Sequence, residues 1–204
     1  MNAQERIYHA FYTSKKDRLY FSELKELTRL SNSSLQNILA RLINQRIVKK
    51  EETKANVFFI IKNKKVFALE FAKIDLQKFE SLNRNIRLPL KDFLELLPKG
   101  IATILLFGSS SRNKEIEKSD IDLMIILNKF DNEKLQELYE KEMIDKIEEI
   151  GKDIQTRSVH TISLAYTNTE NMKKDSDHLV NQAIETGFPL LNQQYYHEVL
   201  KNEH

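Results

Sequence analysis

The sequence predicts an α+β protein whose first part is helical and ends in a hairpin, while strands alternate with helices in the second. Helical periodicity followed by two short apolar runs predicts the first part, and apolar strand-like runs between amphipathic segments predict the second. Residues 1–87 carry 18 Lys and Arg against 9 Asp and Glu, a net +9, whereas residues 88–204 carry 14 against 21, a net −7. The expected division is residues 1–65, a connecting segment at 66–87, and residues 88–204.

Three helices are predicted in the first part. Residues 3–13 have apolar side chains on one helical face. Ser22 is expected to cap a short second helix over residues 22–27. Residues 30–33 are expected to form a turn, and a third helix with a continuous apolar stripe is predicted from about residue 34 to 46.

Two strands are predicted to follow the third helix. Residues 47–50 and 57–61 flank a polar tip at residues 51–56, which indicates a β-hairpin. The order helix, helix, turn, helix, hairpin is typical of a winged helix-turn-helix, and residues 21–52 resemble that region of archaeal and bacterial winged-helix regulators. The resemblance implies double-stranded DNA as a partner, and a surface for protein contact or dimerisation is the alternative.

A winged helix would place the third helix in the major groove of DNA. Ser34, Asn37 and Arg41 lie at helical spacing toward the bases, and Gln36 and Asn44 flank that face. The lysines of the hairpin would meet phosphates, in line with the basic charge of this half. These lysines are Lys49, Lys50 and Lys54.

A helix is predicted between the two parts, over residues 66–82. Its apolar positions lie on more than one face, so it either connects the two parts or forms the seam of a homodimer. Residues 84–88 are expected to be a polar joint, because the residue before Pro89 is disfavoured in a helix. A short helix at residues 90–97 then leads into the second part.

The most informative segment is residues 104–127, ILLFGSSSRNKEIEKSDIDLMIIL. A buried strand ends at Gly108, where backbone can approach a ligand closely, and the serines that follow offer hydroxyls and amides to an anion. Arg112 adds a permanent charge suited to phosphate. Asp120 and Asp122 occupy alternate positions of the next strand and so share a face. Two carboxylates on one face require a cation, and Mg²⁺ (or Mn²⁺) shared with substrate phosphates is the natural one.

This segment resembles the signature of the polymerase-β-like nucleotidyltransferase superfamily, in particular its minimal nucleotidyltransferases. Their pattern is Gly-Ser, ten residues, then Asp-x-Asp, often with Ala-Arg-Gly in the loop, which reads Ser111-Arg112-Asn113 here. The resemblance covers about half of the chain and implies a small mixed sheet flanked by helices, with metal at Asp120 and Asp122. It also implies that ATP or another NTP contacts Gly108, Ser109, Ser110 and Arg112.

The family usually carries a third carboxylate on a later strand. The candidate strand, residues 157–166, holds no acid, and by resemblance His160 stands near that position. Either His160 replaces the acid as ligand or base, or the site binds nucleotide without efficient catalysis. An ordinary hydrogen-bonded strand histidine is the alternative reading of His160.

Two further helices are expected in the second part. One covers residues 133–150 and ends at Gly151 as its C-cap, and the other covers residues 177–186 and ends at Gly187. The closing sequence AIETGFPLL is similar to the usual end of minimal nucleotidyltransferases.

Composition excludes several classes of protein. The chain has no cysteine, which rules out a disulfide framework and thiolate metal sites. The first residues lack the apolar region of a signal peptide, and no apolar run approaches the roughly 20 residues needed to span a bilayer. A soluble, cytoplasmic protein that does not contact membranes is therefore expected.

Two functions are compatible with these features. In the first, a DNA-binding enzyme transfers a nucleoside monophosphate, AMP from ATP, to a hydroxyl of a protein, a small molecule or an RNA end; a toxin-like protein acceptor would make it antitoxin-like. In the second, a winged-helix transcriptional regulator has a catalytically weak or inactive nucleotidyltransferase domain that binds nucleotide or a partner protein. Both hold together for an autoregulating antitoxin.

Overall fold

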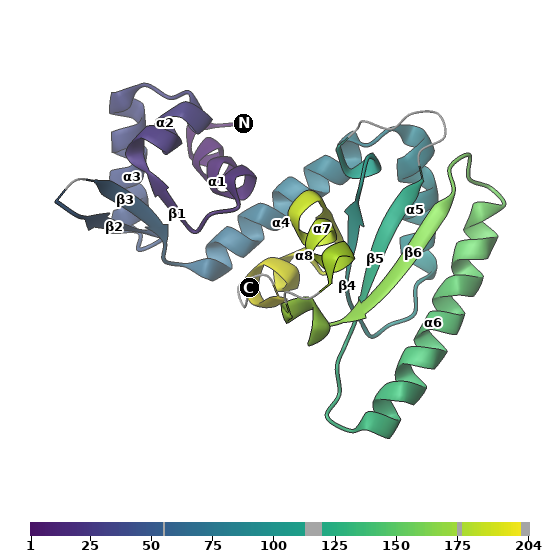
Figure 1. Cartoon of the computed structure of the whole chain (residues 1–204). Coiled ribbons are helices and arrows are strands. Elements are labelled where there is room, and N and C mark those ends of the chain that lie inside the picture. Colours follow the sequence, from purple (N-terminus) through teal and green to yellow (C-terminus); the bar gives the residue numbers. More distant parts are fainter. Residues whose placement is uncertain (55, 113–119, 175–176, 201–204) are drawn as a thin grey trace. The chain divides into compact units, whose positions relative to one another are not determined.

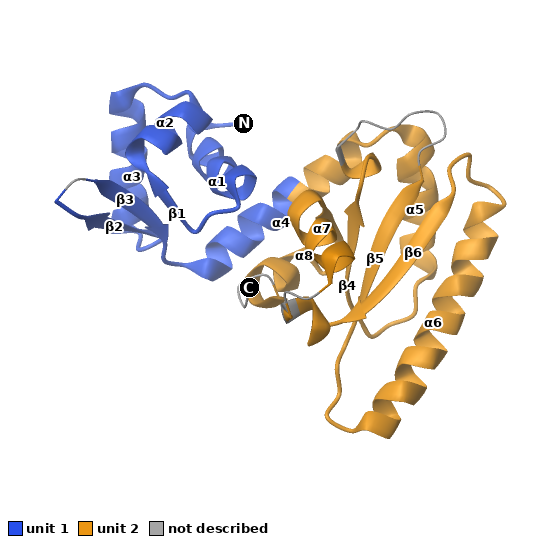
Figure 2. Ribbon diagram, viewed as in Figure 1, with its two compact units in different colours: residues 1–74 blue, residues 75–204 orange. Residues whose placement is uncertain are grey.

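The computed structural model describes residues 1–54, 56–112, 120–174 and 177–200 (Figure 1). The chain divides into two compact units, unit 1 at residues 1–74 and unit 2 at residues 75–204 (Figure 2). The division falls inside one helix, α4, that begins in unit 1 and ends in unit 2.

Unit 1 is a group of helices packed on a small antiparallel sheet with strand order β1-β3-β2. Its core joins the inner faces of the helices to the sheet, and Leu24, Leu35 and Leu42 are completely buried. Phe67 of α4 closes this core, with its ring centroid 5.2 Å from that of Phe11. The elements are α1 (Ala3–Ser14), β1 (Arg18–Tyr20), α2 (Phe21–Thr28), α3 (Asn32–Asn44), β2 (Val48–Glu52), β3 (Val57–Ile61) and the start of α4 (Lys64–Ser81).

The predicted cap of α2 is wrong. The helix begins at Phe21, one residue before the expected cap Ser22, and the Glu23 carboxylate accepts the amide of Tyr20 at 2.8 Å. Glu23 also accepts a hydrogen bond from Lys16 at 2.7 Å. Strand β1 was not expected, because three residues are too short for a periodic signal and β1 is defined only by its pairing with β3.

The start of α3 also differs from the expected one. The helix begins at Asn32, inside the predicted turn, because the Ser31 hydroxyl accepts the amide of Ser34 at 3.2 Å and caps it. It ends at Asn44, two residues before the expected end at Arg46, where the backbone has a positive φ of 58°.

Unit 2 contains a mixed sheet with strand order β6-β5-β4-β7, in which β5 and β6 run parallel and the other neighbours run antiparallel. Helices α5 and α6 cover one face, and α7 with the C-terminal turns covers the other (Figure 1). A buried hydrogen bond of 2.6 Å between His197 and Asp75 anchors the C-terminal turn to α4. The elements are α5 (Arg84–Leu96), β4 (Ile101–Phe107), β5 (Ile121–Leu127), α6 (Glu133–Gln155), β6 (Ile162–Asn168), α7 (His178–Thr186), β7 (Phe188–Leu191), α8 (Gln193–Tyr195) and a π-helical turn (Tyr196–Leu200).

Two expectations about helices in unit 2 are corrected. Helix α5 begins at Arg84 and contains Pro89. Proline removes one backbone hydrogen bond of the helix, and the complete burial of Ile86, Leu90 and Phe93 on one face offsets this loss. Gly151 is buried within α6 and is not its cap. A Cβ at Gly151 would lie 3.0 Å from Leu164 of β6, so this glycine permits the close approach of helix and strand.

The observed class is α+β, with small sheets flanked by helices, as predicted. In the described ranges, the apolar stretches of the helices all fall short of what crossing a membrane requires.

We expect Glu23→Ala to lower the free energy of unfolding of unit 1 by about 1 kcal/mol at neutral pH, since it removes the acceptor for Tyr20 and the partner of Lys16. The hydrogen bonds from Lys16 and then Tyr20 hold the pKa of Glu23 below its ordinary value of 4.5. The stabilisation is therefore present above pH 4.5 and is lost as the pH falls through the lowered pKa. Urea unfolding over this pH range measures it. The exposed Glu26→Ala on the same helix is the control, and equal effects of the two changes would contradict the capping role.

Candidate functional site

Asp120 and Asp122 lie at the start of β5, an interior strand of the sheet. Ile121 and Leu123 pack into the core under α5 and α6, whereas Met124 packs into the core under α7. Because side chains alternate along a strand, Asp120 and Asp122 face the α7 side. Asp120 is exposed and Asp122 is half-buried.

Gly108 directly follows β4 and lies beside the Asp122 carboxylate. Antiparallel pairing sets Phe107 opposite Asp122, and Gly108 then turns with a positive φ of 72°. A Cβ built on Gly108 would overlap Oδ2 of Asp122. The carboxylate therefore occupies the place that any other side chain would take, and only glycine satisfies both the space and the backbone conformation.

The three serines after Gly108 have different roles. Ser110 is completely buried, and its hydroxyl donates to the carbonyl of Asp120 at 2.9 Å. Ser111 donates to the carbonyls of Gly108 at 2.9 Å and of Thr186 at 3.2 Å. Ser110 therefore joins the turn to the aspartate strand, and Ser111 joins the turn to the end of α7. Ser109 is half-buried and, of the three, offers its hydroxyl to a ligand most directly.

Two residues of the predicted loop lie outside what the structure describes. Asn113 falls in the range 113–119, and the side chain of Arg112 is likewise outside the described part. The predicted phosphate contact of Arg112 therefore stays a prediction. So does that of Ser110, whose hydroxyl already binds within the protein.

Asp122 is set apart from its neighbours by the direction of its pKa shift. Burial and, to a smaller extent, the neighbouring charge of Asp120 raise the pKa of Asp122 above its usual range. A raised pKa means that the ionised form lacks compensation from the protein. A cation bound between the two carboxylates would supply that compensation.

The residue opposite Asp122 on the neighbouring strand is Ser163. The expected strand at residues 157–166 in fact begins at Ile162, and parallel pairing sets Asp122 beside Ser163. Ile162 and Leu164 pack toward α6, so Ser163 shares the face of Asp122, and its side chain is exposed. Sequence reasoning missed Ser163 because the register of a parallel pair depends on contacts distant in sequence.

His160 lies before β6 and outside the sheet, contrary to the expectation of a strand residue. It is buried, and its carbonyl accepts hydrogen bonds from Ser158 at 2.7 Å and from Gln155 at 3.2 Å. A catalytic role of His160 stays a prediction. Within the described residues, no group of three or more His, Asp or Glu side chains is arranged to hold a metal ion.

The residues predicted to face DNA lie on α3 and on the β2–β3 hairpin of unit 1, all of them exposed or partly exposed. Gln36, Asn37, Arg41 and Asn44 are exposed on α3, and Ser34 is half-buried at its edge. The Arg41 guanidinium donates to the amide oxygen of Gln4 in α1 at 2.6 Å, which orients it without cancelling its charge. The hairpin lysines are all exposed; they are Lys49, Lys50 and Lys54.

Comparison with known proteins found one family. Residues 86–185 match the family model described as a nucleotidyltransferase domain. No curated protein and no solved structure matched the chain. The matched range contains the turn at Gly108, both aspartates and Ser163. Residues 86–185 are therefore similar to a nucleotidyltransferase domain, which suggests nucleotidyl transfer in general as the chemistry of this region.

Proposed function

We propose that the protein transfers a nucleoside monophosphate, AMP from ATP, to a hydroxyl of a protein acceptor. The observation that carries the proposal is the fit of Asp122 against Gly108, beside Asp120 and the Ser109 hydroxyl. This arrangement places two neighbouring carboxylates, one of them half-buried, beside a turn that can approach phosphate closely. A toxin-like protein is the acceptor that the resemblance to antitoxin-like minimal nucleotidyltransferases favours.

The donor set fits Mg²⁺ or Mn²⁺. Magnesium in phosphate-transfer sites is usually held by one or two carboxylates together with substrate phosphates, and Asp120 and Asp122 are two such carboxylates. The raised pKa of Asp122 fits a site whose charge is balanced by a cation. When bound, the metal would neutralise the triphosphate and the charge that develops on it.

The residues around the aspartates would position the triphosphate. Gly108 leaves room for phosphate oxygens beside the backbone, and the Ser109 hydroxyl can donate to one of them. Ser110 and Ser111 keep the turn in place against Asp120 and Thr186. Rigid positioning of this kind is the main contribution of a protein to phosphoryl chemistry.

The proposed reaction is a displacement at the α-phosphorus. The acceptor hydroxyl oxygen forms a bond to phosphorus, the bond to the β-phosphate oxygen breaks, and pyrophosphate leaves with the bonding electrons. The hydroxyl proton passes to a base, for which the sequence suggests His160.

The proposal for unit 1 is DNA binding through a winged helix-turn-helix. The order of helices and hairpin, the exposed polar face of α3 and the exposed hairpin lysines support it. The net charge of +9 over residues 1–87 supports attraction to a polyanion.

A second candidate is a regulator whose nucleotidyltransferase domain binds nucleotide with little turnover. Ser163 stands beside Asp122 where a third carboxylate would complete a metal site, and a hydroxyl neither binds metal strongly nor serves as a base near neutral pH. This observation favours the second candidate, whereas the pair Asp120 and Asp122 favours the first.

The first experiment separates these candidates with ATP labelled at the α-phosphate, Mg²⁺ and a host-cell extract as the source of acceptors. We expect label transfer that falls by about 10²-fold or more in Asp122→Asn, because the variant loses the charge that holds the metal. Asp131→Asn, an exposed aspartate after the far end of β5, is the matched control and should retain transfer. Mg²⁺-dependent ATP binding without transfer to any acceptor would favour the regulator, and absence of both would exclude each candidate.

The second experiment compares two glycines with positive φ, Gly108 at 72° and Gly100 at 107°. Gly108→Ala is expected to abolish Mg²⁺-dependent ATP binding, because the new methyl would displace the Asp122 carboxylate. In Gly100→Ala the methyl would lie 3.8 Å from Tyr139, so only backbone strain results and ATP binding should persist. Calorimetric titration with ATP measures binding, and thermal unfolding checks that both variants fold. Retained binding in Gly108→Ala would refute the proposed position of the nucleotide.

The third experiment measures binding of a fluorescent duplex DNA by anisotropy over a range of salt concentrations. We expect log K to fall linearly with log salt, and each of Lys49→Gln and Lys54→Gln to reduce the slope by about 1. Lys73→Gln removes an exposed lysine of α4 that pairs with Glu70 and serves as the control. Binding that is insensitive to salt, or equal slopes for all variants, would argue against the proposed interface.

A further inference from the structure

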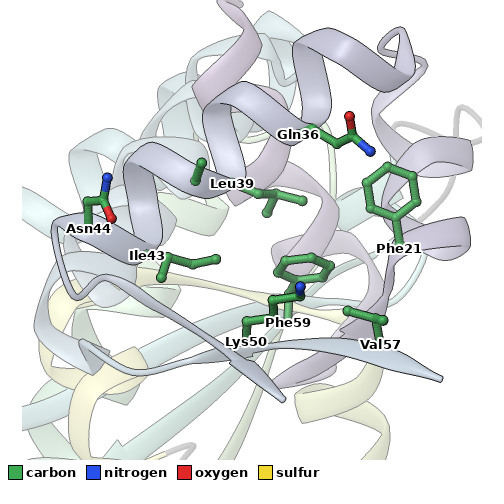
Figure 3. A pocket seen from close by; sticks show the side chains of 9 residues that line it. Phe21, Gln36, Leu39, Ile43, Asn44, Lys50, Val57 and Phe59 are labelled. Carbon is green, nitrogen blue, oxygen red and sulfur yellow. The ribbon is translucent and has the colours of Figure 1, made fainter. Parts of the chain in front are cut away.

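A pocket of about 590 Å³ opens between α3 and the β2–β3 hairpin of unit 1 (Figure 3). This volume lies within the range of small-molecule sites, which is roughly 300–1,000 Å³. Leu39 and Phe59 are nearly fully buried and form its floor, and Phe21 stands at the start of α2 on its side. The remaining apolar lining residues are Ala40, Ile43 and Val57.

The polar residues that line the pocket carry a single positive charge. Gln36 and Asn44 contribute neutral amides from α3, and Lys50 contributes the one charged side chain among the lining residues. Lys50 pairs with Glu52 on the same strand, and both side chains are about half exposed. An exposed ion pair of this kind stabilises a protein by only about 0–1 kcal/mol. An anionic group on a ligand can therefore take the place of Glu52 beside Lys50.

The apolar walls indicate the body of the ligand. The rings of Phe21 and Phe59 have centroids 6.3 Å apart with planes inclined by 49°. Inclined phenyl rings favour contact with the faces and edges of another aromatic ring. Amides at the rim can donate hydrogen bonds to oxygen atoms, as can the lysine.

We propose that this pocket binds an aromatic monocarboxylate, with its ring against Leu39 and Phe59 and its carboxylate at Lys50. Gln36 and Asn44 also belong to the surface proposed to face DNA. Occupation of the pocket therefore weakens DNA binding, a consequence that rests on the proposed DNA-binding function. The binding site itself is independent of that function.

The probe is 1-naphthoate, titrated calorimetrically into the full chain, with 1-naphthalenemethanol as the same ring without the carboxylate. We expect 1-naphthoate to bind about tenfold or more tightly than the alcohol, because its carboxylate can accept a charge-assisted hydrogen bond from Lys50. Decanoate tests the aromatic requirement, and binding of decanoate as tight as that of 1-naphthoate would overturn it. No binding of 1-naphthoate would overturn the proposal.

Variants locate the bound probe. Lys50→Gln should weaken 1-naphthoate about tenfold and leave the alcohol unchanged. Lys49→Gln is the matched control for probe binding, since Lys49 is the adjacent strand residue, points to the other face and does not line the pocket. Ala40→Trp fills the pocket from an exposed helix position and should remove binding of both compounds, with thermal unfolding to check the fold. Unchanged binding in Ala40→Trp, or equal losses in the two lysine variants, would place the probe elsewhere.

The effect on DNA is measured separately. Addition of 1-naphthoate should weaken duplex binding by the wild-type chain, whereas the same concentration of 1-naphthalenemethanol should weaken it less. If the chain binds 1-naphthoate and no duplex DNA even without it, the DNA-binding function fails and the pocket stands. If the chain binds DNA but does not bind 1-naphthoate, the proposed ligand pocket fails and the DNA-binding function stands.

Discussion

The pairing of β4 with β5 is the constraint on which the site depends. It sets Phe107 opposite Asp122, so that the turn at Gly108 comes to lie against a carboxylate. The bond from the buried Ser110 hydroxyl to the carbonyl of Asp120 joins the two segments again, beyond the ladder. A slip of one residue in this pairing would turn both aspartates toward the apolar core under α5 and α6.

Both faces of the sheet resist such a slip. Ile104, Leu106 and Leu123 are fully buried under α5 and α6, and Leu105 is fully buried on the α7 side. Each strand therefore has apolar partners in two cores at once, and a shift would expose one set while inserting carboxylates into the other. The packed sheet holds Asp122 half-buried, and this burial raises the pKa of its carboxyl group.

Local signals in the sequence predicted most elements, and they failed where packing outweighed them. Pro89 suggested the start of a helix, yet three fully buried side chains extend α5 through it. Gly151 suggested a helix end, but its lack of a Cβ serves contact with Leu164. Strand β1 had no periodic signal and depends on β3 for its pairing. The pocket beside α3 likewise had no signal in the sequence, since its lining residues come from four elements, α2, α3, β2 and β3.

By itself, the sequence determined the α+β class, the nucleotidyltransferase signature and the shared face of Asp120 and Asp122, because alternation along a strand is a local property. Only the tertiary structure decided which residue stands beside those carboxylates. Parallel register depends on how α6 returns the chain to the sheet, and it brings Ser163 to Asp122 while His160 remains before the strand. That non-local contact is the observation on which the choice between the two proposed functions rests.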